Sequence, residues 1–328
     1  MSNFLDYINI SNFKSIKNLK IEGCKRINLF IGRPNVGKSN ILEALSLFSA
    51  PYLKENKFRN LSSLVRIEHE TELFRSGNFE QPIEVKTNYG LAKVIFDRHE
   101  GIKFFLDTKD GTGSYQVDEK LNIKIPASNY FESAIKKYTF SGRTEFANSP
   151  LRYLLPPFGN NLLSVIERDL DLKDQIVRMF KEYNLNLVFD KASQSLKVMQ
   201  PSKINDEIFL IPYNSIADTL QRIIFYKSAI TSNTNSILLF EEPEAHSFPP
   251  YMTHLTQEMI YRKDNQYFVA THSPFILNDL LENGRDDLSV FMVHYEDNET
   301  NVRRLSEEEL YEVFQNGIDL FTNSESFI

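Results

Sequence analysis

A chain of 328 residues is long enough for one large domain or two small ones, and a formal net charge of −7 argues against a general, non-specific nucleic-acid binder. Apolar residues make up 41%, as in an ordinary folded domain, and Cys24 is the only cysteine, which excludes an intramolecular disulfide. No apolar stretch is long enough to cross a bilayer, and the first ten residues lack the build of a signal peptide. We therefore expect a cytoplasmic protein.

The first expected elements lead into a phosphate-binding loop. Short apolar runs predict three strands, at residues 5–13, 16–21 and 26–31. Residues 32–39 then read Gly-Arg-Pro-Asn-Val-Gly-Lys-Ser, which matches the pattern G-x-x-x-x-G-K-[ST]. A helix should follow to about residue 48 and end at Pro51. Because a strand, a tight loop and a helix are the context that this motif needs, the segment predicts a nucleoside triphosphate site.

The residues of this loop suit an anion. Gly32 and Gly37 let the backbone turn so that its N–H groups converge, and the following helix adds the positive end of its dipole. The ammonium group of Lys38 should reach the β- and γ-phosphates, and the hydroxyl group of Ser39 should hold Mg²⁺. The predicted nucleotide-binding set is Gly32, Arg33, Pro34, Asn35, Val36, Gly37, Lys38, Ser39 and Asn40.

The middle of the chain has a mixed pattern. Alternating apolar residues from 83 to 125 predict strands, with a hairpin turn at Asp110-Gly111. An irregular connection, a helix and a hairpin are expected next, at 139–161, 169–183 and 185–189 with 196–199. Strands and helices alternate again beyond residue 208. We therefore expect an α/β core made of residues 1–90 and 205–328, with an inserted α+β lid at about 91–204.

Two apolar strands in the last third end in residues that suit phosphoryl transfer. Glu241 and Glu242 follow one strand, and His272 follows the next. Because ligands bind beyond the carboxyl ends of the strands in open α/β sheets, these side chains should meet at one edge. Glu241 fits the acid near Mg²⁺, and Glu242 fits the group that orients or deprotonates water. His272 would donate a hydrogen bond to a γ-phosphate or to the attacking water.

The same residues are open to another chemistry. The metal ligands of a nuclease or metallohydrolase could be drawn from Glu241, Glu242, Glu244, His246 and His272. Their spacing does not match a zinc pattern, and two of the acids already have a role at a nucleotide. The nucleotide interpretation is therefore favoured over the metal-centre interpretation.

Together these segments resemble an ABC-type ATPase head of the RecF, SMC and OLD branch. The resemblance is carried by residues 8–16 (INISNFKSI), 35–45 (NVGKSNILEAL), 241–246 (EEPEAH) and 271–277 (THSPFIL). Within the branch, the chain is similar to the compact ATPases of OLD-type phage-defence systems. The implied fold is a P-loop NTPase with an ABC-ATPase-type head, in which a mixed sheet is flanked by helices and carries an inserted α+β lid subdomain.

The resemblance also implies a homodimer or a higher oligomer. Two copies would pair head to tail around two ATP·Mg²⁺, with residues 244–246 as the D-loop at the seam. Ser215 stands where the branch keeps the serine of its signature helix, which completes the partner's site in trans, but the usual glycine-rich form is missing. Glu241 replaces the usual aspartate, and Gln81 is a poor match to the Q-loop glutamine.

The resemblance suggests a nucleotide-driven switch. OLD-type proteins usually carry a Toprim nuclease domain after the head, whereas the stretch after Leu281 is expected to form two strands and a helix capped by Ser306 with Glu309. The favoured hypothesis is a dimeric ATPase that regulates a separate effector, such as a nuclease or toxin, in bacterial phage defence. The first alternative is a RecF-like DNA-binding ATPase in DNA repair, which would make nucleic acid a partner. The second is a stand-alone hydrolase that acts on nucleic acid.

Overall fold

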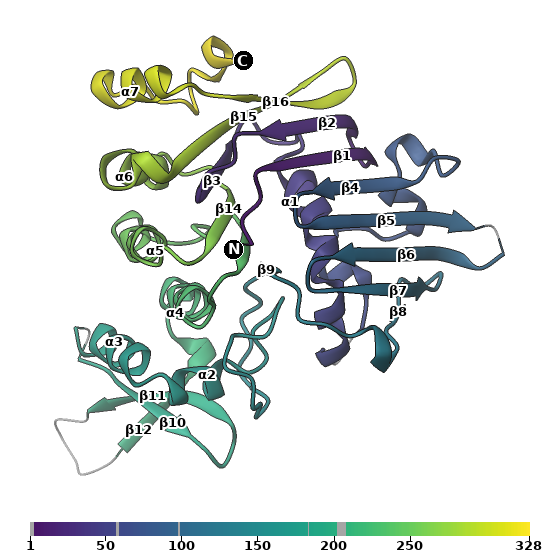
Figure 1. Cartoon of the computed structure of the whole chain (residues 1–328). Helices are drawn as coiled ribbons and strands as arrows, with labels where there is room; N and C mark the ends of the chain where they lie inside the picture. Colours follow the sequence, from purple (N-terminus) through teal and green to yellow (C-terminus); the bar gives the residue numbers. More distant parts are fainter. Residues whose placement is uncertain (1–2, 57–58, 98, 183, 202–207) are drawn as a thin grey trace.

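The computed structural model describes residues 3–56, 59–97, 99–182, 184–201 and 208–328. Two large sheets lie on either side of one helix, α1 (Lys38–Ser46), and a smaller sheet stands apart from them (Figure 1). Helix α1 contacts strands of both large sheets. The phosphate loop immediately before α1 therefore lies at the junction of the two layers.

The central sheet has six strands in the order β16-β15-β3-β14-β13-β9. Five of them are parallel, and the edge strand β16 is antiparallel. Their bounds are β3 Ile27–Ile31, β9 Ile135–Tyr138, β13 Ile237–Glu241, β14 Gln266–Ala270, β15 Leu288–Glu296 and β16 Glu299–Arg304. Every residue of β3 and β14 is buried, as expected for parallel strands covered on both faces.

The second large sheet is antiparallel and has seven strands in the order β2-β1-β4-β5-β6-β7-β8. Their bounds are β1 Tyr7–Phe13, β2 Ile16–Glu22, β4 Ile83–Thr87, β5 Gly90–Asp97, β6 Gly101–Thr108, β7 Gly111–Val117 and β8 Ile123–Lys124. Burial alternates along these strands because one face packs on the core. In the β6–β7 hairpin Thr108 pairs with Gly111, so the turn residues are Lys109 and Asp110, one position before the predicted pair.

Helices cover the other face of the central sheet (Figure 1). They are α4 (Asp218–Thr231), α5 (Pro249–Tyr261), α6 (Pro274–Asn283) and α7 (Glu307–Asn316). A smaller unit combines α2 (Leu162–Arg168) and α3 (Leu170–Lys181) with the three-stranded sheet β10-β11-β12 (Asn186–Asp190, Ser195–Pro201 and Ile208–Pro212). The predicted capping box of Ser306 and Glu309 is present at α7. No helix among the described residues is long and apolar enough to span a membrane.

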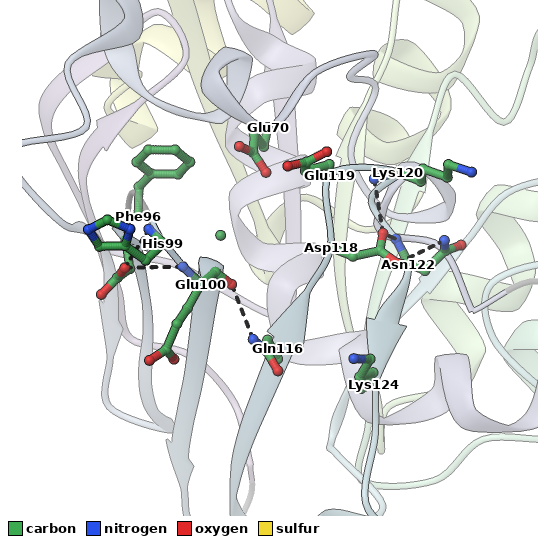
Figure 2. Close-up of a pocket in the computed structure, with 12 residues that line it drawn as sticks. Glu70, Phe96, His99, Glu100, Gln116, Asp118, Glu119, Lys120, Asn122 and Lys124 are labelled. Atoms are coloured by element: carbon green, nitrogen blue, oxygen red, sulfur yellow. Dashed lines mark hydrogen bonds between the residues drawn. The ribbon is translucent and has the colours of Figure 1, made fainter.

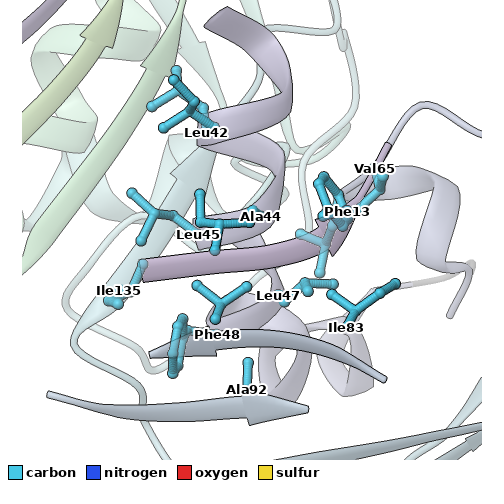
Figure 3. Packing of buried hydrophobic residues seen from close by; sticks show 14 of the residues in the cluster. Phe13, Leu42, Ala44, Leu45, Leu47, Phe48, Val65, Ile83, Ala92 and Ile135 are labelled. Carbon is cyan, nitrogen blue, oxygen red and sulfur yellow. The ribbon is translucent and has the colours of Figure 1, made fainter. Parts of the chain in front are cut away.

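The two cores share the strands of the central sheet. Phe30 of β3 points into the core formed by α1 and the antiparallel sheet, whereas its neighbours Leu29 and Ile31 point into the core under the helices. Figure 3 shows the first core, where Leu45 and Phe48 approach Ile135 and Ala92. The central sheet is thus an interior layer rather than a surface.

Two predicted boundaries differ from the structure. The chain continues past the end of α1 as a 3-10 helix, Leu47–Glu55, with Pro51 inside it. Proline is tolerated there because its fixed φ suits this tighter helix. The predicted insert, 91–204, is divided among all three sheets: β5 to β8 join the antiparallel sheet, β9 joins the central sheet, and β10 and β11 join the small one. Residue 91 lies inside β5, so it does not coincide with a break between sheets.

Candidate nucleotide site

The phosphate loop is fixed by contacts with the C-terminal strands. Gly37 has φ +103, and a Cβ atom there would lie 2.1 Å from Oγ1 of Thr300 in β16. A Cβ atom on Gly32 would lie 2.1 Å from the carbonyl oxygen of Val293 in β15. Oγ1 of Thr300 also donates a hydrogen bond of 2.9 Å to the Val36 carbonyl. Close packing therefore requires glycine at both positions, and the backbone conformation also requires it at Gly37.

The remaining loop residues divide into exposed and anchored positions. The loop tip is exposed, and Arg33 there forms an ion pair of 2.7 Å with Glu325. Asn35 adopts a positive φ of 63°, which helps the loop to turn. Asn40, on the first turn of α1, donates 2.7 Å to the hydroxyl of Ser15. The predicted set is thus one continuous segment that runs from the loop before α1 into the first turn of that helix.

Lys38 is buried inside the loop. Its Nζ atom donates to the carbonyl oxygens of Gly32 and Arg33, at 2.7 and 2.8 Å. Burial lowers the pKa of Lys38 to about 8, although the nearby Glu242 and Glu244 oppose the shift. A negative group entering the loop would restore the stability of the charged form.

The predicted metal-side acid lies in a network of cations that sequence reasoning missed. Oε1 of Glu241 is 2.5 Å from Nη2 of Arg66, and Oε2 is 3.9 Å from Nζ of Lys137. Arg66 also contacts Oε1 of Glu43, which is fully buried and bound by Lys14 as well. No sequence pattern marks Arg66, because its partners are brought to it only by the fold.

This network limits how Mg²⁺ fits the site. The described residues hold no group of three or more His, Cys, Asp or Glu side chains arranged to bind a metal, so the acids and histidines at the two strand ends do not form such a centre. Magnesium is usually held by one or two carboxylates together with phosphate oxygens. Ser39 and Glu241 suit that mode, with Arg66 competing for the Glu241 carboxylate.

Glu242 and His272 come together as predicted. The two half-exposed side chains lie with Oε1 of Glu242 3.6 Å from Nε2 of His272. Glu242 has a positive φ of 42°, and its N–H donates 2.9 Å to the Ala270 carbonyl at the end of β14. Burial and the Lys38 ammonium lower the pKa of His272, while Glu242 opposes the shift. The imidazole is therefore neutral near pH 7, with one N–H to donate.

Glu244, in the predicted D-loop, is largely buried and is bonded to the turn after β14, while the place of residues 244–246 at a dimer seam stays a prediction. Its Oε1 accepts hydrogen bonds from Oγ1 of Thr271, at 2.7 Å, and from the backbone N–H of His272, at 2.8 Å. Its Oε2 is buried and has no hydrogen-bond partner among the described residues. Burial raises the pKa of Glu244. Its place in a short acidic run gave no sign of this role.

Ser215 does not cap the helix that follows it. It ends a 3-10 turn, Tyr213–Ser215, and α4 begins three residues later, with Ala217 at the N-cap and no side-chain cap. Ile216 is extended and separates the two segments, so Ser215 lies outside the start of α4. Ser215 is exposed. Its participation in a partner's site stays a prediction.

Residues 4–211 match the family model of the AAA ATPase domain. This chain belongs to that family. The matched part of the ATPase domain includes the phosphate loop, α1 and the whole antiparallel sheet. The Glu241–Glu242 and His272 segments lie beyond it.

Shorter stretches of this ATPase domain are similar to curated proteins. It is 31% identical over 108 residues to the DNA replication and repair protein RecF of Clostridium kluyveri, covering 33% of this chain and 26% of that protein. It is 35% identical over 97 residues to RecF of Caldanaerobacter subterraneus, covering 28% of this chain and 26% of that protein. A stretch of 38 residues is 53% identical to an ATP/GTP phosphatase of Helicobacter pylori, covering 12% of this chain and 10% of that protein. The chain therefore spans about a quarter or less of the length of these relatives.

Solved structures confirm the fold over almost the whole chain. The SmcHead bound to the C-winged helix domain of ScpA superposes with a TM-score of 0.52 at 14% identity, covering 93% of this chain and 99% of that one. The Smc head domain from Pyrococcus furiosus superposes with a TM-score of 0.51 at 12% identity, covering 95% of this chain and 99% of that one. The predicted ABC-type head with a mixed sheet and flanking helices is therefore confirmed as the fold of this ATPase domain.

A large pocket of this ATPase domain lies away from these residues. It measures about 590 Å³ and lies at one end of β5 to β8 (Figure 2). Its lining includes five carboxylates and two lysines: Glu70, Asp97, Glu100, Asp118, Glu119, Lys120 and Lys124. An acidic lining repels a polyphosphate, so this pocket is not a second nucleotide site.

Proposed function

We propose that this protein binds and hydrolyses ATP with Mg²⁺ and works as a dimeric switch. The observation that carries the proposal is the approach of Glu242 and His272 to 3.6 Å at the carboxyl edge of β13 and β14. Lys38 is close enough to interact with both: Glu242 favours the charged form of Lys38, and Lys38 lowers the pKa of His272. A base, a hydrogen-bond donor and a phosphate-binding ammonium group thus share one edge of the central sheet.

Each side chain has a separable task in hydrolysis. Lys38 would exchange the carbonyls of Gly32 and Arg33 for the β- and γ-phosphates. Glu242 would orient or deprotonate water in line with the γ-phosphate, and His272 would donate a hydrogen bond to that phosphate. When bound, Mg²⁺ would neutralise phosphate charge, with Ser39 and Glu241 as its protein ligands.

The dimer would be a head-to-tail sandwich of two ATP molecules. Ser215 and the first turn of α4 are the part that we propose for the partner's γ-phosphate. Asp218 lies in that first turn, where it pairs with Arg222 at 2.7 Å. The acid weakens the positive helix end that would attract phosphate, so we expect modest affinity between heads.

We further propose that the switch regulates a separate effector protein in phage defence. The support is the resemblance of the EEPEAH and THSPFIL segments to OLD-type ATPases. A RecF-like role on DNA is the second candidate, supported by the similarity to two RecF proteins. Binding to DNA that weakens steeply with salt would favour the RecF-like role, and salt-independent failure to bind would favour the effector role.

Mass in solution and phosphate release test the switch together. Glu242→Gln should abolish phosphate release while retaining ATP, so that ATP and Mg²⁺ convert the variant from monomer to dimer. Glu282→Gln, an exposed acid on α6, is the matched control and should behave as wild type. Normal hydrolysis by Glu242→Gln would exclude Glu242 as the catalytic residue. Lost hydrolysis with no change in mass would exclude the sandwich.

A further inference from the structure

The turn after β13 is tied to the turn after β14 by one carboxylate. We propose that Glu244 is a positioning residue, whose Oε1 holds the Thr271–His272 turn in place and thereby sets His272 opposite Glu242. The catalytic consequence rests on the proposed ATPase function, whereas the positioning itself does not. Glu244 lies two residues from the predicted base and has no assigned role in the chemistry of the site.

The contacts of Glu244 suit a positioning role. Both donors to Oε1 come from the other turn, Oγ1 of Thr271 at 2.7 Å and the N–H of His272 at 2.8 Å. The second bond fixes the backbone of the very residue that faces Glu242. Without an acceptor at this place, the hydroxyl group of the buried Thr271 and the N–H of His272 would both lose their partner, and fewer bonds would hold the turn in place.

The turn that carries Glu244 is closed by backbone hydrogen bonds of its own. Glu242 and His246 both adopt positive φ, 42° and 58°, which side chains other than glycine rarely do. Within the turn the N–H of Ala245 donates to the Glu242 carbonyl, and the N–H of Ser247 donates to the Glu244 carbonyl. A rigid support is what a residue needs in order to place another one accurately.

The same turn also reaches α4. Oγ1 of Thr219, in the first turn of α4, donates 3.0 Å to the His246 carbonyl. A continuous set of bonds therefore runs from the start of α4 through Glu244 to His272 and Glu242. If a partner's nucleotide moves the start of α4, this set is the direct physical connection to the histidine.

Titration of His272 tests the positioning without nucleotide. In wild type, burial and Lys38 lower the pKa of His272. In Glu244→Ala the freed turn should move the imidazole into solvent, and its pKa should rise towards about 6.5, the ordinary histidine value. Glu244→Gln keeps an acceptor for both donors and should leave the pKa unchanged. Imidazole NMR signals, assigned with His272→Gln, give the readout.

Steady-state kinetics test the consequence for hydrolysis. Glu244→Ala should lower kcat by at least about tenfold at unchanged KM, since one general base or donor contributes 10²–10⁴-fold when correctly placed. Glu244→Gln should retain most of the rate, and Thr271→Val should fall between them. Glu282→Ala removes an exposed acid elsewhere and serves as the control for charge.

The outcomes separate this inference from the proposed function. An unchanged His272 titration in a folded Glu244→Ala variant would overturn the positioning. A Glu244→Gln variant as impaired as Glu244→Ala would also overturn it, because the charge and not the acceptor would then matter. If Glu244→Ala fails to fold, the Thr271→Val titration decides in its place. If the wild type does not hydrolyse ATP but the variants show the expected pKa changes of His272, the ATPase proposal is refuted and the positioning role of Glu244 stands.

Discussion

At the phosphate loop, single atoms determine whether the backbone fits. In Gly37→Ala the new methyl group would strike Thr300, whose hydroxyl is held by Val36, and the residue would also be strained by its φ of +103°. We expect a loss of at least about 2 kcal/mol in the free energy of unfolding and loss of ATP binding. Gly142→Ala has a positive φ but meets nothing within 4 Å, so only about 1 kcal/mol should be lost. Urea unfolding of both variants would show the difference, and equal losses would contradict it.

The pKa of Lys38 predicts how ATP affinity depends on pH. Below about pH 8 the free protein already carries the charged ammonium group that phosphate needs. Above that pH the group must take up a proton on binding, so the affinity should fall by up to about tenfold per pH unit. Calorimetry in buffers of different ionisation enthalpy should detect that proton uptake. Lys38→Arg should bind without this dependence, since arginine stays charged throughout. Equal affinity at pH 7 and 9.5 would refute the shift.

The anchoring of α1 depends on a buried ion pair between secondary-structure elements. Lys14, in the turn between β1 and β2, lies 2.5 Å from Glu43 of α1, whose side chain has no exposed surface. Lys14→Ala should lower the free energy of unfolding by about 3 kcal/mol, because the buried carboxylate loses a partner. Lys20→Ala, whose pair with Glu22 is exposed, should change it by less than about 0.5 kcal/mol. Chemical denaturation of the two variants provides the comparison, and similar losses would show that Arg66 alone satisfies Glu43.

Sequence patterns located the elements whose signals are local. The phosphate loop, the strands that end in Glu241 and His272, and the capping box at Ser306 each lie within a few consecutive residues. Strand β9 was not predicted, because the sequence Ile-Lys-Lys-Tyr is not typical of a buried strand, although all four residues are buried. Its lysines are satisfied by distant partners, such as the Leu64 carbonyl for Lys137. The contacts of Arg66 and Glu244 were hidden for the same reason, since their partners come from other parts of the chain.

The molecule as a whole should unfold as one unit. Its two cores share β3, β13 and β14, and the predicted insert contributes β9 to the same sheet. Loss of either core would expose one face of that buried sheet, so neither core is expected to survive alone. Differential scanning calorimetry should show a single unfolding transition. The method suits this chain because it does not depend on tryptophan fluorescence, and the chain has no tryptophan. Two separate transitions would instead support an independently folding insert.

The contact between Thr300 and Val36 joins residues 264 positions apart. A ribosome makes the phosphate loop well before β15 and β16, the strands that hold it. Domains generally fold as their chain emerges, so the loop would lack its supporting contacts until those two strands have left the exit tunnel. Nascent chains stalled before residue 288 would then carry the complete loop sequence and still fail to retain ATP. Nucleotide binding in this protein would therefore begin only after β15 and β16 have emerged from the ribosome.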